Sequence, residues 1–186
     1  PHAEVPREAG PRSTHDGSAS FEADLRSAPQ DEDVGSVRGD ALDIQVALTA
    51  EGRVVAYCGH VDLGTGIRTA LAQTVAEELD WPFDTVEMVL GDTDDTPDQG
   101  ATIASETIQV TSLSLRAGAA QIRGRLVTLA AQALACPEAE IEIVDGTVRR
   151  AGGEAVDLAT LLGNRRTLLP LDPATPLKPT EAHRIV

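Results

Sequence analysis

The chain has 186 residues, which is enough for one domain with a substantial core and too few for two. Its hydrophobic fraction of 41% is that of a globular protein, but the aromatic fraction is only 2%, so Ala, Val, Leu and Ile must build the core. The formal charge of −15, with no basic stripe along the sequence, argues against a nucleic-acid partner.

Two further features bear on the compartment. No apolar run approaches the roughly 20 residues of a membrane helix, and no leader-like basic and apolar stretch opens the chain. Cys58 and Cys136 lie far apart without C-x-x-C spacing, so they encode neither a zinc nor an iron–sulfur site and are typical of buried thiols. We expect a soluble cytoplasmic protein, with the periplasm as the open alternative.

The N-terminal segment, residues 1–40, is rich in Pro, Ser, Asp and Glu and carries only scattered hydrophobic residues. This composition predicts an acidic tail that is either flexible or laid across a partner. The acidic run at 31–33 is more typical of a solvated linker than of a site.

Alternation of apolar and polar residues predicts two strands, 44–48 and 54–58, joined by a turn at 50–53. Apolar residues then recur at every fourth position from Ile67 to Leu79, which predicts a helix with one apolar face. The helix is expected to end before Pro82, because proline disfavours helix at the residue before it.

Residues 85–90 read as a further strand and are followed by a polar loop, 91–100. The four aspartates of this loop suggest calcium, but the EF-hand spacing is not met, and turn formation by Asp is the favoured interpretation. The order strand, turn, helix, strand predicts an α+β fold, a small mixed sheet with two packed helices.

A second, longer helix is predicted with one face formed by Leu115, Ile122, Leu126, Leu129 and Ala133. Small residues, including Gly118 and Gly124, would let it approach a neighbour closely.

The rest of the domain is predicted as a hairpin over 140–148, turning at an Asp-Gly pair, and a short helix over 157–163. Prolines every three residues from Pro170 to Pro179 indicate an extended strap. We therefore divide the chain into the tail, a domain at 41–163 and a proline-rich linker at 164–186. The linker shows no pattern of a final helix or strand.

The glycine-spaced turn at 59–66 joins the second strand to the first helix. Gly64 and Gly66 can take positive φ and approach another group closely, and Thr65 between them would project outward. The unpaired N–H groups at the start of the helix near Ile67 would suit a phosphate or another anion. A purely structural turn is the alternative, because the spacing is neither that of a dinucleotide-binding motif nor that of a P-loop.

These stretches resemble the molybdenum-binding subunit of the xanthine dehydrogenase family, above all its isoquinoline oxidoreductase and nicotinate dehydrogenase branch. The resemblance covers about residues 43–186. It is carried by the glycine motif and helix at 59–73, by the helix end, strand and loop at 76–93, and by the Thr/Ser segment at 96–105. The first and third motifs are distinctive together.

The resemblance implies that Gly64, Thr65 and Gly66 line the pterin cofactor and that Thr65 stands beside the molybdenum, where the family usually has glutamine. It implies that Thr102 and Ser105, before the long helix, contact the cofactor's pyrophosphate or nucleotide end, although N-capping alone is the alternative. The cofactor implied is molybdopterin, expected in its cytosine dinucleotide form.

The activity implied is hydroxylation of an aldehyde or N-heterocycle carbon with oxygen from water. The family's catalytic glutamate matches no position here, and residues 178–186 resemble the linker that leads into its later domains. We therefore expect the isolated chain to be inactive. A larger molybdopterin-binding polypeptide and an iron–sulfur subunit, which carries the clusters, would complete it.

Two alternatives stay open. Thr65 in place of glutamine favours a non-catalytic scaffold or cofactor-insertion module, and a plain α/β domain of another role ranks below it. His60 and His183 are interpreted as packing or surface residues rather than as a metal site. Asp62 could help to order the glycine loop. We expect its carboxylate to be turned away from an anionic cofactor.

Overall fold

The computed structural model describes residues 45–163, 171–172 and 174–184, all of which belong to one compact unit, residues 39–186. The predicted tail at 1–40, the predicted strand residue Ile44 and the first seven residues of the predicted linker, 164–170, lie outside the described residues. The proposed domain boundaries therefore stay predictions.

The first sheet contains three strands in the order β1-β2-β3. Strand β1 (Val46–Leu48) pairs antiparallel with β2 (Val54–Cys58), which pairs parallel with β3 (Val86–Leu90). The sheet is mixed, as predicted, and its central strand β2 is the most deeply buried. Parallel pairing of β2 with β3 requires a crossover connection, and helix α2 (Ile67–Leu79) provides it.

Helix α2 buries the predicted apolar face, including Leu71, Val75 and Leu79, each at 0% exposure. It ends at Asp80, whose φ of 58° is left-handed and whose N–H donates to the carbonyl of Ala76. The predicted bounds of this helix are confirmed.

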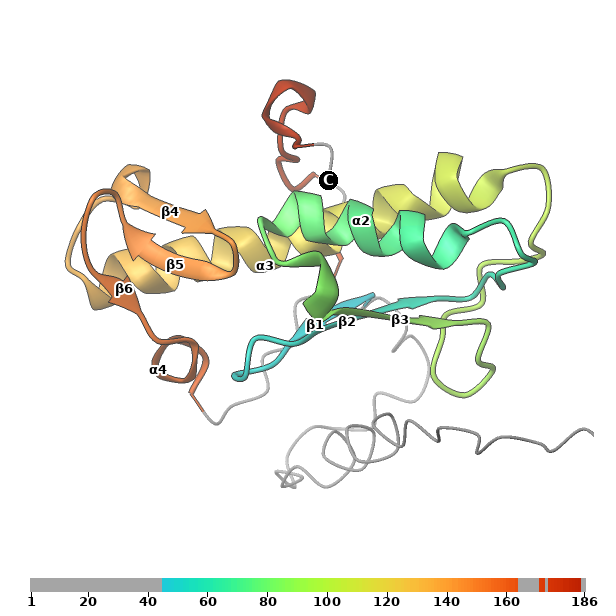
Figure 1. Cartoon of the computed structure of the whole chain (residues 1–186), viewed down its shortest axis with the longest axis horizontal. Helices are drawn as coiled ribbons and strands as arrows, with labels where there is room; N and C mark the ends of the chain where they lie inside the picture. The colour runs from blue at the N-terminus through green and yellow to red at the C-terminus, as the bar shows by residue number, and fades with distance from the viewer. Residues whose placement is uncertain (1–44, 164–170, 173, 185–186) are drawn as a thin grey trace, which may run out of the picture. The chain divides into compact units, whose positions relative to one another are not determined.

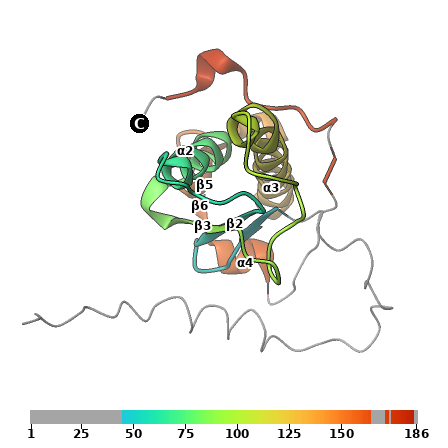
Figure 2. The ribbon, with the colours of Figure 1, turned by 90° about the vertical axis from the view of Figure 1, so that its right-hand side faces the viewer.

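Helix α3 (Ser112–Ala133) lies beside α2, and Figure 2 shows the two helices above the strands of the first sheet. A π-helical turn, Thr107–Thr111, precedes it and was not predicted. Leu115 and Leu126 are buried as expected, but Ala133 is exposed, so the apolar face fades toward the C-terminus. The backbone of α3 approaches β1 closely at Gly118, because a Cβ there would lie 3.2 Å from Val46 Cγ2.

The second sheet packs on the C-terminal half of α3 (Figure 1). It contains the predicted hairpin, β4 (Ile141–Val144) and β5 (Thr147–Arg150), and a short third strand, β6 (Ala155–Val156), that was not predicted. Helix α4 (Leu158–Leu162) follows, N-capped by Asp157, whose carboxylate accepts from the Thr160 N–H at 3.0 Å.

Residues 174–184 lie against the face of the α2–α3 pair that points away from the first sheet (Figures 1 and 2). They include a 3-10 turn, Thr180–Ala182. The segment is extended around this turn, in agreement with the predicted strap, but it contacts both helices. None of the described helices combines the length and hydropathy that a membrane crossing requires.

Candidate functional site

The glycine turn is locked to the loop that leads into the π-helical turn. A Cβ at Gly59 would lie 2.0 Å from the carbonyl oxygen of Pro97, so only glycine fits where the two loops meet. The Gly59 N–H donates to Gln99 Oε1 at 2.8 Å. The start of the glycine turn is therefore held against the second loop by these contacts.

The side chain of His60 adds two hydrogen bonds that hold the turn to the segment 99–107. The side chain is buried at 1% exposure, with Nδ1 2.7 Å from Thr107 Oγ1 and Nε2 3.1 Å from the Gln99 carbonyl oxygen. A carbonyl only accepts, so in the neutral ring Nε2 carries the hydrogen and Nδ1 accepts from the threonine hydroxyl. Both ring nitrogens are engaged, so of the two predicted roles, packing or surface, His60 has the packing role.

Asp62 closes the turn on itself. Its Oδ1 accepts from the N–H groups of Gly64 at 2.9 Å and Thr65 at 3.0 Å, and its Oδ2 accepts from that of Arg68 at 3.3 Å. The N–H of Arg68 foremost, with those of Gly64, Thr65 and Gly66, lowers the pKa of Asp62, because these bonds favour the ionised carboxylate.

The amides of Gly64, Thr65 and Arg68 therefore already have an anionic partner within the turn, the side chain of Asp62. An anion site on the remaining amides at the start of α2 stays a prediction. The expected role of Asp62 in ordering the loop is confirmed. The sequence signal was an aspartate two and three residues before the amides that it binds, the spacing of an Asx turn.

The tip of the turn faces outward. Gly64 and Gly66 have φ of 88° and 75°, and a Cβ at either would meet no described atom within 4 Å. Thr65 is exposed between them. The predicted trio therefore presents backbone and one hydroxyl to the outside.

Thr102 joins the second predicted segment to the turn, because its Oγ1 accepts from the Val61 N–H at 3.0 Å. Ser105 is exposed and left-handed, with φ of 61°, directly after Ala104 at 50°. Two consecutive non-glycine residues in this conformation are strained. No hydrogen bond in the described residues links Ser105 to the glycine turn, so the structure brings only Thr102 to it.

The capping alternative for Thr102 and Ser105 is wrong, because no side chain caps the π-helical turn or α3 in the described residues. The aspartate loop behaves as predicted for turn formation: Asp92 Oδ1 accepts from the N–H groups of Asp94 at 2.8 Å and Asp95 at 3.1 Å. The part of the chain that the structure describes contains no group of three or more His, Cys, Asp or Glu placed for a metal ion.

Sequence reasoning missed a group of exposed apolar residues at this end of the molecule. The end patch, as we name it, is the set of exposed apolar residues on the glycine turn, the Thr102 loop, the π-helical turn and the start of α3. Leu63 is 70% exposed and Ile103 61% exposed. The end patch consists of Val61, Leu63, Ile103, Ile108, Val110 and Leu113.

Comparison with known proteins identifies the family of the chain. The family description "Molybdopterin cofactor-binding domain" matches residues 23–174. The chain belongs to this family. The predicted resemblance to the molybdenum-binding subunit of the xanthine dehydrogenase family is confirmed, and so is the α+β fold of a partial molybdopterin cofactor-binding domain.

The relatives of this molybdopterin cofactor-binding domain are oxidoreductases. A nicotinate dehydrogenase subunit of Pseudomonas putida is 46% identical over 151 residues, which cover 81% of this chain and 13% of the relative. A probable hypoxanthine oxidase of Escherichia coli K12 is 31% identical over 117 residues, 62% of this chain and 12% of the relative.

Solved structures agree with the fold. Quinoline 2-oxidoreductase from Pseudomonas putida 86 superposes with a TM-score of 0.55 at 25% identity, covering 70% of this chain and 17% of that one. Reconstituted CO dehydrogenase from Oligotropha carboxidovorans gives a TM-score of 0.56 at 25% identity, covering 67% and 16%. The chain thus spans about one sixth or less of the length of the proteins that it matches.

Proposed function

We propose that this chain forms one wall of a molybdopterin site and that a larger polypeptide completes the site. The observation that carries the proposal is the outward-facing tip Gly64-Thr65-Gly66, which has open space over both glycines. Hydrogen bonds of Gly59 and His60 attach the start of the same turn to the rest of the domain. When bound, the cofactor with its molybdenum would supply hydroxylation of an aldehyde or N-heterocycle carbon with oxygen from water.

The turn suits an uncharged part of the cofactor. The absence of Cβ atoms at Gly64 and Gly66 lets a ring edge approach the backbone, and Thr65 can donate or accept a hydrogen bond. A phosphate does not fit here, because Asp62 already occupies the amides and would repel it. Thr65 is the residue that we place nearest the molybdenum.

The phosphate or nucleotide end of the cofactor is assigned to the Thr102–Ser105 segment. The Thr102 oxygen accepts from Val61 N–H, which leaves its own hydrogen free to be donated to a ligand oxygen. Ser105 presents a second exposed hydroxyl from a strained backbone. We propose the cytosine dinucleotide form of the cofactor for this segment.

The end patch supports a partner at this site. Exposed apolar surface of this kind, next to a ligand turn, is typical of an interaction surface. We propose that the patch is covered by the larger molybdopterin-binding polypeptide and that an iron–sulfur subunit carries electrons away. The two cysteines of the described domain, Cys58 and Cys136, are free thiols, which supports the proposed cytoplasmic location.

A second candidate is a non-catalytic scaffold or cofactor-insertion module with the same fold. Thr65 favours it, because a threonine hydroxyl is too short to span the distance of the glutamine that the family usually carries.

The experiment compares Thr65→Gln and Thr65→Ala in the complex assembled with its genomic neighbours. Turnover, molybdenum and pterin content are measured on the same samples. If Thr65 lines a working site, Thr65→Ala lowers turnover by at least about tenfold, the factor that corresponds to losing about 1.4 kcal/mol of interaction. Unchanged turnover and cofactor content in both variants would favour the scaffold, and full activity of the lone chain would overturn the proposal of a shared site.

A further inference from the structure

The C-terminal turn of α2 is strongly acidic. Glu77, Glu78 and Asp80 lie within four residues, and the last turn of the helix contains no basic residue. A helix C-terminus already carries partial negative charge from its unpaired carbonyl groups, so carboxylates destabilise it and a cation stabilises it. The acidic end of α2 needs a cation from elsewhere in the chain.

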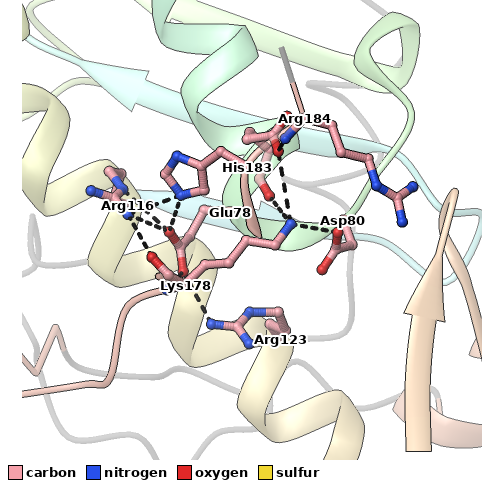
Figure 3. A network of polar contacts seen from close by, with 8 residues as sticks. Glu78, Asp80, Arg116, Arg123, Lys178, His183 and Arg184 are labelled. Atoms are coloured by element: carbon pink, nitrogen blue, oxygen red, sulfur yellow. Dashed lines mark hydrogen bonds and ion pairs between the residues drawn. The ribbon is translucent and has the colours of Figure 1, made fainter. Parts of the chain in front are cut away.

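Lys178 supplies that cation, and it is the only lysine of the whole sequence. Its Nζ donates to the carboxylate of Asp80 (Figure 3). It also donates to the Glu77 carbonyl oxygen at 2.7 Å and lies 3.9 Å from Glu77 Oε1. The lysine side chain is only 9% exposed. Lys178 thus acts as a C-terminal cap for a helix that ends almost 100 residues before it.

Glu78 receives the backbone of the same segment. Its side chain is fully buried; Oε1 accepts from the Lys178 N–H at 2.6 Å and from Arg123 Nη2 at 3.1 Å. Oε2 accepts from Arg116 Nη2 at 2.9 Å, and Arg116 Nη2 also donates to the Lys178 carbonyl oxygen at 3.2 Å. One carboxylate therefore joins α2, α3 and the C-terminal segment (Figure 3).

The rest of the segment adds polar contacts and little apolar burial. The Arg184 N–H donates to the Glu77 carboxylate, and His183 Nε2 lies 3.3 Å from Arg116 Nη2. Leu177 remains 38% exposed, and no described residue between 174 and 184 is fully buried. Such a segment depends on charge and hydrogen bonding, whereas the helix pair beneath it depends on a packed apolar core.

We propose that residues 174–184 are an ionic clasp. Lys178 neutralises the acidic end of α2, and the clasp opens and closes on the α2–α3 pair without unfolding that pair. The clasp lies on the face of the helix pair opposite the first sheet and does not depend on the molybdopterin assignment.

The single lysine makes the test specific. The full chain is treated with an amine-reactive ester at 0.05 M and 1 M NaCl, and mass spectrometry follows acylation of the peptide that contains Lys178. Backbone amide exchange of α2 and α3 is measured in parallel. At 1 M salt the screening length falls to about 3 Å, so ionic contacts that water can reach weaken.

We expect acylation of Lys178 to be about tenfold faster at 1 M NaCl, and about tenfold or more faster in Asp80→Asn at low salt, a factor that corresponds to about 1.4 kcal/mol. Amide protection in α3, and in α2 before its last turn, stays within twofold. Lys178→Met, which keeps the side-chain length and removes the charge, speeds amide exchange in the last turn of α2.

Glu142→Gln is the matched control, because it removes a carboxylate from an exposed ion pair with Arg149, at 2.7 Å, in the second sheet. It leaves Lys178 acylation unchanged. The proposal is overturned if Asp80→Asn reacts at the control rate. It is overturned equally if salt or Asp80→Asn exposes Lys178 only together with loss of protection throughout α2 and α3, since the segment would then be part of one cooperative core.

Discussion

The two ends of helix α2 are built in opposite ways. At the N-terminal end, Asp62 binds amides no more than six residues away and the tip of the turn is open to the outside. At the C-terminal end, Glu78 is fully buried and binds partners 38, 45 and 100 residues away. The first end is arranged for contact with another molecule, and the second is closed by the chain itself.

We expect the buried C-terminal end of α2 to contribute more to the free energy of unfolding than the open N-terminal end. Replacing Glu78 by Ala removes the shared acceptor of two arginines and a backbone amide, and we expect a loss of about 3 kcal/mol in the free energy of unfolding. The arginines are 21% and 27% exposed and can regain some water, which keeps the loss at the low end for a buried pair.

Denaturant unfolding measures the loss. Glu142→Ala, at an exposed ion pair, should cost no more than about 1 kcal/mol. Equal losses in the two variants would contradict the distinction between the closed end and an ordinary surface pair.

Gly59→Ala should give the next largest effect. The new Cβ would lie 2.0 Å from a backbone oxygen, so the two loops must separate, at a cost of about 1–3 kcal/mol. Gly124→Ala is the control, because its Cβ meets no described atom within 4 Å in the interior of α3, and it should stabilise the protein by about 0.5–1 kcal/mol. Thermal unfolding of both variants tests this, and a neutral Gly59→Ala would contradict the close approach.

Asp62 gives a smaller, pH-dependent effect. Its pKa is lowered in the folded protein, so its contribution to stability is present above the ordinary aspartate value of 3.8 and is lost as the pH falls through the lowered folded value. The difference in melting temperature between wild type and Asp62→Ala should therefore be constant at neutral pH and shrink in acid. A difference that persists unchanged at the lowest pH would contradict the carboxylate cap.

The end patch should matter least for stability. The double variant Leu63→Ser and Ile103→Ser removes only exposed apolar surface, so we expect the free energy of unfolding to change by no more than about 0.5 kcal/mol. Copurification with the larger polypeptide should nevertheless be lost, whereas Phe83→Ser, which is 39% exposed elsewhere, should keep it. Retained copurification of the double variant would argue against the patch as the interface.

The difference between the two ends also explains what the sequence could predict. Helix α2 follows from apolar residues four apart, and the glycine turn follows from its own residues, so both depend on short-range information. The clasp depends on contacts across as many as 100 residues, which periodicity does not encode. One signal was present: Glu78 lies three residues after Val75 and seven after Leu71, on the apolar face, where a carboxylate requires buried partners.

The sequence did not predict some other elements, for local reasons. The π-helical turn Thr107–Thr111 differs from an α-helix only in its hydrogen-bond register, which the residue pattern does not distinguish. Strand β6 has two residues, too few for alternation to show. Local pattern also did not show that Asp62, a side chain of the turn itself, binds the Gly64, Thr65 and Arg68 amides near the start of α2.

The central claim is that the open end of α2 is a wall of the molybdopterin site. The most direct measurement is molybdenum and pterin content per chain in the assembled complex for Gly66→Val against Gly152→Val. Both glycines are left-handed, with φ of 75° and 72°, and a Cβ at either meets no described atom within 4 Å, so the backbone strain is matched. We predict that Gly66→Val assembles but loses most of its molybdenum and pterin while Gly152→Val keeps both; a full cofactor load in Gly66→Val would contradict the account.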